Sequence, residues 1–228
     1  MSKPRLLFIH RSVGQNLIND SQLYTLVEQA GQPFLLSDFN QNTNTFRAAN
    51  EEPHTVAWQF PGGDTTPEDY AALFSAERLA AGDPMLKEIL AYDSIAIKSC
   101  FPNTRITSDA MLERHTQAYK NIIQFFRSQP TKKLIILTSP PLIPTLTLPS
   151  FAKRARKLAQ WLASTDFGSN VFVFDFFDAL AVPEGKFQAN TLRREYRRRF
   201  PFDSHPNAAA AKATAPKIVQ FFTDIARR

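Results

Sequence analysis

Short apolar runs alternate with longer amphipathic segments along the chain, and this alternation constrains the fold more than any other feature of the sequence. The runs are rich in Leu, Ile, Val and Phe, as buried strands are. They are nearly continuous in apolar character, which is expected when helices cover both faces of a sheet. The pattern therefore predicts about five buried strands, at residues 5–10, 33–36, 94–97, 133–138 and 170–175.

The segments between these runs have the spacing of amphipathic helices. Apolar residues recur with roughly helical period in them, and Ser108 fits the N-cap of the clearest segment. Because consecutive parallel strands are joined by right-handed crossovers, this order predicts a three-layer α/β/α sandwich around a central parallel sheet. The expected helices cover residues 17–30, 108–128, 151–164 and 208–226.

The length and composition suit one globular domain over residues 1–228, with 43% hydrophobic and 21% charged residues. Residues 40–63 depart from the alternation, because they are rich in Asn, Thr, Pro and Gly and have no clean period. A long irregular insert in a compact domain usually serves function. We therefore expect this insert to wall a functional cleft.

Several classes of protein are disfavoured by the sequence. No stretch of 18 apolar residues runs without a charge, so a membrane partner is not expected. The apolar run Leu6–Ile9 is too short for the core of a signal peptide, and a single cysteine, Cys100, excludes an internal disulfide. These features together predict a cytoplasmic protein.

The net charge is +6, and part of it comes from the arginine-rich segment 193–199. Two interpretations stay open: a solvated helix face, or a rim that attracts an anionic substrate. Basic residues are otherwise spread along the chain, and no nucleic-acid-binding motif is present. A nucleic-acid partner is therefore not expected.

Ser12 is a candidate nucleophile, because ligands of parallel α/β sheets bind beyond the carboxyl ends of the strands. The first strand leaves through His10-Arg11-Ser12 directly into a helix. The free N–H groups of a helix N-terminus can stabilise a developing negative charge. Ser12 as a plain N-cap is the alternative. His10 is either a core residue at the strand end or a substrate contact, and Arg11 is a candidate substrate contact.

The loop before the last helix reads Asp203-Ser204-His205-Pro206-Asn207. His205 could take the proton of a serine hydroxyl, while Asp203 holds the imidazole in the required tautomer. A turn is needed to bring these two side chains together, and Pro206 fits such a corner. The alternative is an Asp N-cap beside an incidental histidine.

Two further segments that follow predicted strands offer donors for an oxyanion. Adjacent glycines at 62–63 permit close approach of the backbone to a ligand, so the Gly63 N–H is one candidate. Asn103, after the third predicted strand, presents a side-chain amide. Lys98 and Cys100 are alternatives for chemistry in the same exit, although an unpaired cysteine is usually buried and inert.

Taken in order, these segments resemble the blocks of the SGNH, or GDSL-like, hydrolase superfamily over nearly the whole chain. The resemblance implies a flavodoxin-like fold, Ser12 as nucleophile, and Ser12, Gly63 and Asn103 around the oxyanion. It also implies Asp203 and His205 as the other members of a triad. The sequence departs from the superfamily pattern at three places: His10-Arg11 replaces Gly-Asp, 99–103 replaces Gly-x-Asn-Asp, and Asp-x-His is one residue shorter than usual.

The activity that the resemblance implies is hydrolysis of an oxygen ester of a small molecule or a glycan, with carbohydrate deacetylation as one form. No metal or organic cofactor is expected, because the histidines are widely separated and no glycine-rich phosphate loop is present. An acyltransferase acting on a glycan and a catalytically silent binding domain are the alternatives. Nothing in the sequence predicts the oligomeric state. The histidines that were considered as metal ligands above are His10, His54, His115 and His205.

Overall fold

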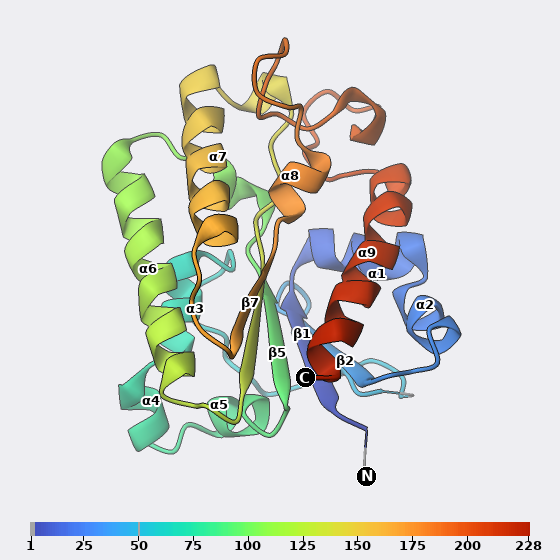
Figure 1. The fold of residues 1–228 in the computed structure, drawn as a ribbon, viewed down its shortest axis with the longest axis vertical. Coiled ribbons are helices and arrows are strands. Elements are labelled where there is room, and N and C mark those ends of the chain that lie inside the picture. Colours follow the sequence, from blue (N-terminus) through green and yellow to red (C-terminus); the bar gives the residue numbers. More distant parts are fainter. Residues whose placement is uncertain (1–2, 50) are drawn as a thin grey trace.

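A central sheet organises the computed structural model, which describes residues 3–49 and 51–228 (Figure 1). Its strand order is β4-β3-β2-β1-β5-β6-β7. Five strands are parallel, which confirms the predicted sheet: β1 (Arg5–His10), β2 (Leu35–Asn40), β5 (Ser94–Lys98), β6 (Lys133–Leu137) and β7 (Val171–Phe174). Two short antiparallel strands extend its edge beside β2: β3 (Thr45–Arg47) and β4 (His54–Thr55).

Strand β1 lies between β2 and β5, so the chain order reverses there. From β1 the chain adds β2 on one side and later returns to add β5 on the other side. Such a switch point opens a crevice at the carboxyl ends of the strands, where ligands of this architecture bind. The topology therefore places a binding position between the exits of β1 and β5.

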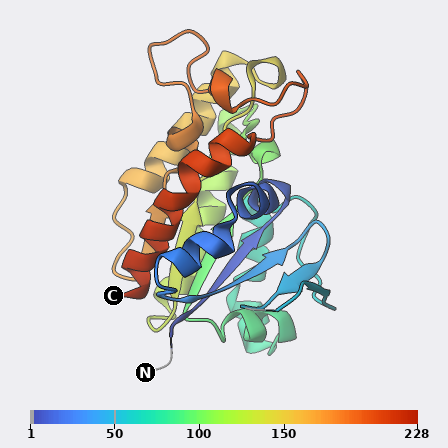
Figure 2. The same ribbon diagram turned by 90° about the vertical axis from the view of Figure 1, so that its right-hand side faces the viewer.

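Helices cover both faces of the sheet, as predicted for a three-layer sandwich (Figure 2). One face packs against α3 (Pro67–Leu73), α5 (Pro84–Ile89), α6 (Asp109–Arg127) and α7 (Pro149–Ser164). The other face packs against α1 (Ser12–Ser21), α2 (Leu23–Gln29) and α9 (Ala208–Ala226). The remaining short helices are α4 (Ala76–Ala80), α8 (Phe176–Leu180), η1 (Phe101–Thr104), η2 (Pro144–Leu146) and η3 (Arg194–Tyr196).

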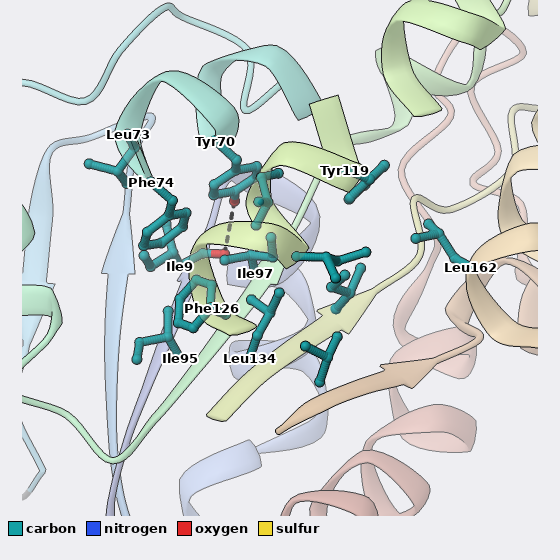
Figure 3. Packing of buried hydrophobic residues seen from close by; sticks show 14 of the residues in the cluster. Ile9, Tyr70, Leu73, Phe74, Ile95, Ile97, Tyr119, Phe126, Leu134 and Leu162 are labelled. Carbon is teal, nitrogen blue, oxygen red and sulfur yellow. Dashed lines mark hydrogen bonds between the residues drawn. The ribbon is translucent and has the colours of Figure 1, made fainter. Parts of the chain in front are cut away.

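The alternation of side chains along each strand divides the core in two. On β1, Leu7 and Ile9 join the cluster under α3 and α6, while Leu6 and Phe8 join the cluster under α1 and α9. Figure 3 shows Tyr70 of α3 above Ile9, where its hydroxyl donates to the Ile9 carbonyl oxygen at 3.2 Å. The same hydroxyl lies 3.3 Å from the carbonyl oxygen of Lys98, so it joins the exits of β1 and β5.

The variant Tyr70→Phe is expected to destabilise the protein by about 1–2 kcal/mol, because it leaves buried carbonyl oxygens without their hydroxyl donor. Tyr70 is fully buried, so water cannot replace the lost hydrogen bond without entering the core. Urea unfolding of the two proteins measures the difference. An unchanged midpoint and slope would show that this hydroxyl does not stabilise the strand exits.

The structure differs from the predicted elements at several places. Strand β2 begins and ends later than the predicted 33–36 run, and the short helices α3, α4, α5 and α8 were not predicted. The helix expected over 17–30 is two helices, because Gln22 adopts a left-handed φ of 56° between α1 and α2. The turn lets Leu23 and Val27 bury themselves in the core. The insert 40–63 is not wholly irregular, since β3 and β4 lie within it and pair next to β2.

Candidate active site

Ser12 is the first residue of α1 and directly follows the exit of β1. Arg11 is the helix N-cap, with an extended backbone. The first intrahelical hydrogen bond runs from the Gln15 N–H to the Arg11 carbonyl oxygen at 3.0 Å. The N–H groups of the first turn have no partner within the helix, so they form a positive end beside the Ser12 hydroxyl.

His205 lies within hydrogen-bond reach of Ser12. Its Nε2 is 2.9 Å from the Ser12 Oγ, and its Nδ1 is 2.6 Å from the Asp203 Oδ1. Because a carboxylate accepts, Nδ1 carries the proton and Nε2 is free to accept from the hydroxyl. The structure thus brings together the three residues that sequence analysis proposed as a triad.

A local turn brings the Asp203 and His205 side chains together despite the short Asp-x-His spacing. The backbone N–H of His205 donates to the Asp203 Oδ1 at 2.8 Å, which forms an Asx turn over these residues. Between them, the buried Ser204 accepts the Ile143 N–H at 3.1 Å and anchors the turn to the loop after β6. Asn207 then caps α9 by accepting the Ala210 N–H at 3.1 Å. One carboxylate oxygen therefore holds both the backbone and the ring of His205.

The pKa of Asp203 lies below its ordinary value. Burial acts to raise this pKa. Hydrogen bonds from the His205 backbone and ring, together with the charges of His205 and Arg198, lower the pKa by more than burial raises it. The Arg198 Nε lies 3.7 Å from the Asp203 Oδ2. The carboxylate is therefore the form that this environment favours.

This shift predicts how stability depends on pH. The unfolded chain binds the Asp203 proton more readily than the folded protein does. The stabilisation is complete above the unfolded pKa of about 4 and is lost as the pH falls through the lower folded pKa. The difference in unfolding free energy between wild type and Asp203→Asn should therefore shrink as the pH falls from about 5 to about 3. Urea titrations at several pH values test this, and a constant difference would contradict it.

Gly14 is required by the close approach of α1 to β1. A Cβ added at this glycine would lie 2.3 Å from the Cβ of His10. The variant Gly14→Ala is therefore expected to cost about 1–3 kcal/mol through overpacking. Thermal and urea unfolding measure it, with Gly63→Ala as a contrast, because no heavy atom of the described residues lies within 4 Å of its added Cβ and its backbone is not left-handed. Equal unfolding of Gly14→Ala and wild type would show that the helix can shift away.

His10 and Arg11 do not lie free to contact a substrate. His10 is fully buried, which corrects its interpretation as a substrate contact and agrees with the core alternative. Arg11 forms an ion pair with Asp64 and donates to the Asn42 Oδ1 at 2.9 Å. Arg11 therefore joins the start of the 40–63 insert to the segment just after it, beside Ser12.

The two oxyanion candidates lie in different settings. Gly63 is exposed, and the structural requirement for glycine falls on its neighbour Gly62, whose φ is 66°. The Asn103 Nδ2 donates to the carbonyl oxygens of Asp64 and Thr65, at 3.1 and 3.4 Å. The contacts of this amide thus support the backbone after Gly63 instead of reaching Ser12.

Cys100 and Lys98 are both buried at the exit of β5. The Cys100 Sγ lies 3.6 Å from the Ser12 Oγ, so the thiol packs against the candidate nucleophile. The Lys98 Nζ donates to the Ser99 carbonyl oxygen at 3.2 Å, and burial lowers the pKa of this lysine. Both residues are closed off from solvent, and of the two it is Cys100 that contacts Ser12.

The arginine-rich segment is a loop with one 3₁₀ turn, η3, and not the helix face that one interpretation supposed. Arg197 is half-buried and donates to the carbonyl oxygen of Leu192 at 2.8 Å. Arg194, Arg198 and Arg199 are exposed. Phe200 and Phe202 follow them with 63% of their surface exposed. A cationic and aromatic rim therefore borders the Asp203–His205 turn.

Sequence reasoning missed one close neighbour of His205. The Phe101 ring meets the His205 ring edge-on, with centroids 4.7 Å apart. Phe101 follows Cys100 at the exit of β5, so its position after a predicted strand was the available signal. The contact restricts rotation of the imidazole.

Across residues 3–49 and 51–228, no group of three or more His, Cys, Asp and Glu side chains is arranged to hold a metal ion. Among the helices described for these residues, none combines the length and hydropathy needed to cross a bilayer.

No protein-family model and no curated protein matches this sequence. Solved structures do match. A lipase from a goat rumen metagenome is 11% identical, with a TM-score of 0.59 over 95% of this chain and 96% of its own. A GDSL-like lipase from Bacteroides thetaiotaomicron is 10% identical, with a TM-score of 0.56 over 98% of this chain and 92% of its own. The fold is that of the GDSL-like hydrolases.

A carbohydrate esterase of family 3 from Talaromyces cellulolyticus shares the same fold. It is 13% identical, with a TM-score of 0.57, and 98% of each chain is covered. The GDSL-like fold that the motif order implied is thus confirmed. Since one fold serves many chemistries, the activity has to be argued from the side chains.

Proposed function

We propose that this protein is a serine-dependent ester hydrolase in which Ser12, His205 and Asp203 act as a triad. The observation that carries the proposal is the unbroken chain of hydrogen bonds from Asp203 through His205 to Ser12. It lies where the exits of β1 and β5 meet, which is the binding position of this architecture. Nucleophile, base and orienting group have the mutual geometry that acyl transfer needs.

In the first half-reaction, the Ser12 Oγ attacks the ester carbonyl carbon while its proton passes to the His205 Nε2. Asp203 stabilises the resulting imidazolium and keeps the ring oriented. The tetrahedral intermediate then collapses, the bond to the alcohol oxygen breaks, and the imidazolium gives its proton to the leaving alcohol. The acyl group remains on Ser12 as an ester.

In the second half-reaction, water attacks the carbonyl carbon of the acyl-enzyme while its proton passes to the His205 Nε2. The acid leaves, and the proton returns to the Ser12 Oγ. A sugar hydroxyl in place of water would yield an acylated sugar, which is the acyltransferase alternative. The products therefore distinguish the two activities.

The oxyanion of the tetrahedral intermediate is proposed to lie at the N-terminus of α1. The Ser12 N–H is the first donor, and the positive end of the helix stabilises the charge. The Gly63 N–H is the proposed second donor. We assign Asn103 a supporting role, because its amide holds the backbone of Asp64 and Thr65 next to Gly63.

The proposed substrates are small acyl esters of small molecules or carbohydrates. About a quarter of the side-chain surface of His205 and of Asp203 is exposed (26% and 25%), so an ester can reach the triad from solvent. One structural neighbour is a carbohydrate esterase, so a sugar ester is among the substrates to be tested. The exposed arginines beside the site would favour a substrate that carries a negative charge.

Incubation with p-nitrophenyl acetate and with acetylated sugars tests the proposal. The wild-type protein is expected to release nitrophenol and acetate above the buffer rate. Chromatography in the presence of a free sugar then separates hydrolysis from transfer. A rate equal to buffer with every ester, together with no reaction with a fluorophosphonate, would favour the silent binding domain.

A further inference from the structure

We propose that His10, Asp38 and Tyr24 form a buried hydrogen-bonded support that orients and polarises the peptide bond between Arg11 and Ser12. The support makes His10 a positioning residue for the nucleophile and its oxyanion donor. This inference rests on the proposed function, because it assigns a catalytic use to the Ser12 hydroxyl and N–H.

The contacts form one chain from α2 to the nucleophile. The Tyr24 hydroxyl donates to the Asp38 Oδ1 at 2.5 Å. The Asp38 Oδ2 lies 3.1 Å from the His10 Nε2, and the His10 Nδ1 lies 2.9 Å from the Arg11 carbonyl oxygen. His10 and Asp38 are both buried, so water does not compete for these groups.

The direction of the hydrogen bonds follows from their partners. A carbonyl oxygen only accepts, so the His10 Nδ1 carries a proton and donates to Arg11. Burial, with the nearby Asp38 carboxylate, raises the pKa of Tyr24, which keeps its hydroxyl a donor. One proton then lies between the His10 Nε2 and the Asp38 Oδ2, on one of these two atoms. In both arrangements Nδ1 remains the donor to the Arg11 carbonyl.

This carbonyl oxygen belongs to the same peptide group as the Ser12 N–H. It accepts twice, from the His10 ring and from the Gln15 N–H in the first turn of α1. Hydrogen bonds to a carbonyl oxygen polarise the peptide group and strengthen its N–H as a donor. The His10 bond therefore acts on the proposed oxyanion donor as well as on the orientation of the peptide plane.

The surrounding packing keeps this support rigid. The absence of a side chain at Gly14 lets α1 lie directly against the His10 side chain. The Phe8 ring lies 4.9 Å from the His10 ring, centroid to centroid, and the Arg47 guanidinium covers the Tyr24 ring at 4.0 Å. The imidazole is thus enclosed, and a shift of Asp38 would move it against the Arg11–Ser12 turn.

Asp38→Asn, Tyr24→Phe and Glu68→Gln test the inference by steady-state kinetics and thermal unfolding. Glu68 forms a matched carboxylate–histidine pair with His115, at 2.8 Å, between α3 and α6 and without contact to Arg11. Misplacement of a catalytic group costs rate, so Asp38→Asn is expected to lower kcat about 10-fold with KM within about 2-fold, and Tyr24→Phe to lower kcat about 3-fold. Glu68→Gln is expected to keep the wild-type kcat even where it lowers the melting temperature.

Rescue at position 10 separates positioning from bulk stability. An asparagine there places an amide near the position of the Nδ1, so His10→Asn should retain more kcat than His10→Leu at equal melting temperature. Wild-type kcat in Asp38→Asn and Tyr24→Phe, or equal kcat in His10→Asn and His10→Leu, would overturn the inference while the hydrolase stands. A wild-type protein without turnover or fluorophosphonate reaction would overturn the proposed function, and the inference with it.

Discussion

Replacing Ser12 by alanine is expected to lower kcat/KM for p-nitrophenyl acetate on the order of 10⁴-fold or more, because it removes the oxygen that carries the acyl group in the proposed mechanism. The variant removes only the Oγ at 2.9 Å from the His205 Nε2. The helix and its N-terminal N–H groups remain, so the melting temperature should change little. Initial rates and thermal unfolding measure both quantities.

Ser21→Ala is the matched control for this variant. Ser21 ends the same helix, and its hydroxyl donates to the Leu17 carbonyl oxygen far from the triad. We expect this control to keep wild-type kcat/KM. Activity in Ser12→Ala within about tenfold of wild type would mean that another nucleophile acts.

Asp203→Asn is expected to lower kcat on the order of 10³-fold or more, with a smaller effect on KM. The asparagine amide can donate to His205, which would favour the tautomer with the proton on Nε2 instead of Nδ1. That tautomer cannot accept the Ser12 proton. The loss should therefore appear in the acylation rate, which stopped-flow release of nitrophenol reports.

The control for this variant is Asp109→Asn. Asp109 is an exposed carboxylate that accepts a hydrogen bond from the Arg154 Nε at 2.8 Å, at the start of α6. It should leave kcat unchanged. Equal activity of Asp203→Asn and Asp109→Asn would show that the short Asp-x-His turn serves the structure of the loop and not the chemistry.

The layered fold was predictable because its strands are continuous apolar runs. The run at 5–10 coincides with β1, and the run at 94–97 with all but one residue of β5. The segment 108–128 became α6 with Ser108 as its N-cap, since the side chain accepts the Met111 N–H at 3.1 Å. In these places local propensity and burial favour the same structure.

Elements that depend on tertiary pairing were not predictable in the same way. Strands β3 and β4 are short; β3 forms because β2 offers it an edge, and β4 pairs with β3 in turn. Gln22 has no special preference for left-handed backbone, so the break between α1 and α2 left no signal. By contrast, α3 carries a capping box between Thr66 and Asp69 with Pro67 at its start, and that signal could have revealed it.

The candidate site was predictable in its reactive residues and not in its supports. Ser12 and the Asp203–His205 pair are identifiable because they follow the first strand and precede the last helix. The role of His10 as a support was not predictable, since its partner Asp38 lies 28 positions away within a buried strand. Only the β1–β2 register, which sets Phe8 opposite Asp38, brings the two elements into contact.

The central claim is that Ser12 is an activated nucleophile, and reaction with a fluorophosphonate tests it most directly. Intact-mass analysis should show one adduct on wild type, peptide mapping should place it on Ser12, and Ser12→Ala should stay unmodified. Asp203→Asn should react more slowly. A wild-type protein without an adduct, or with its adduct on another residue, would contradict the account.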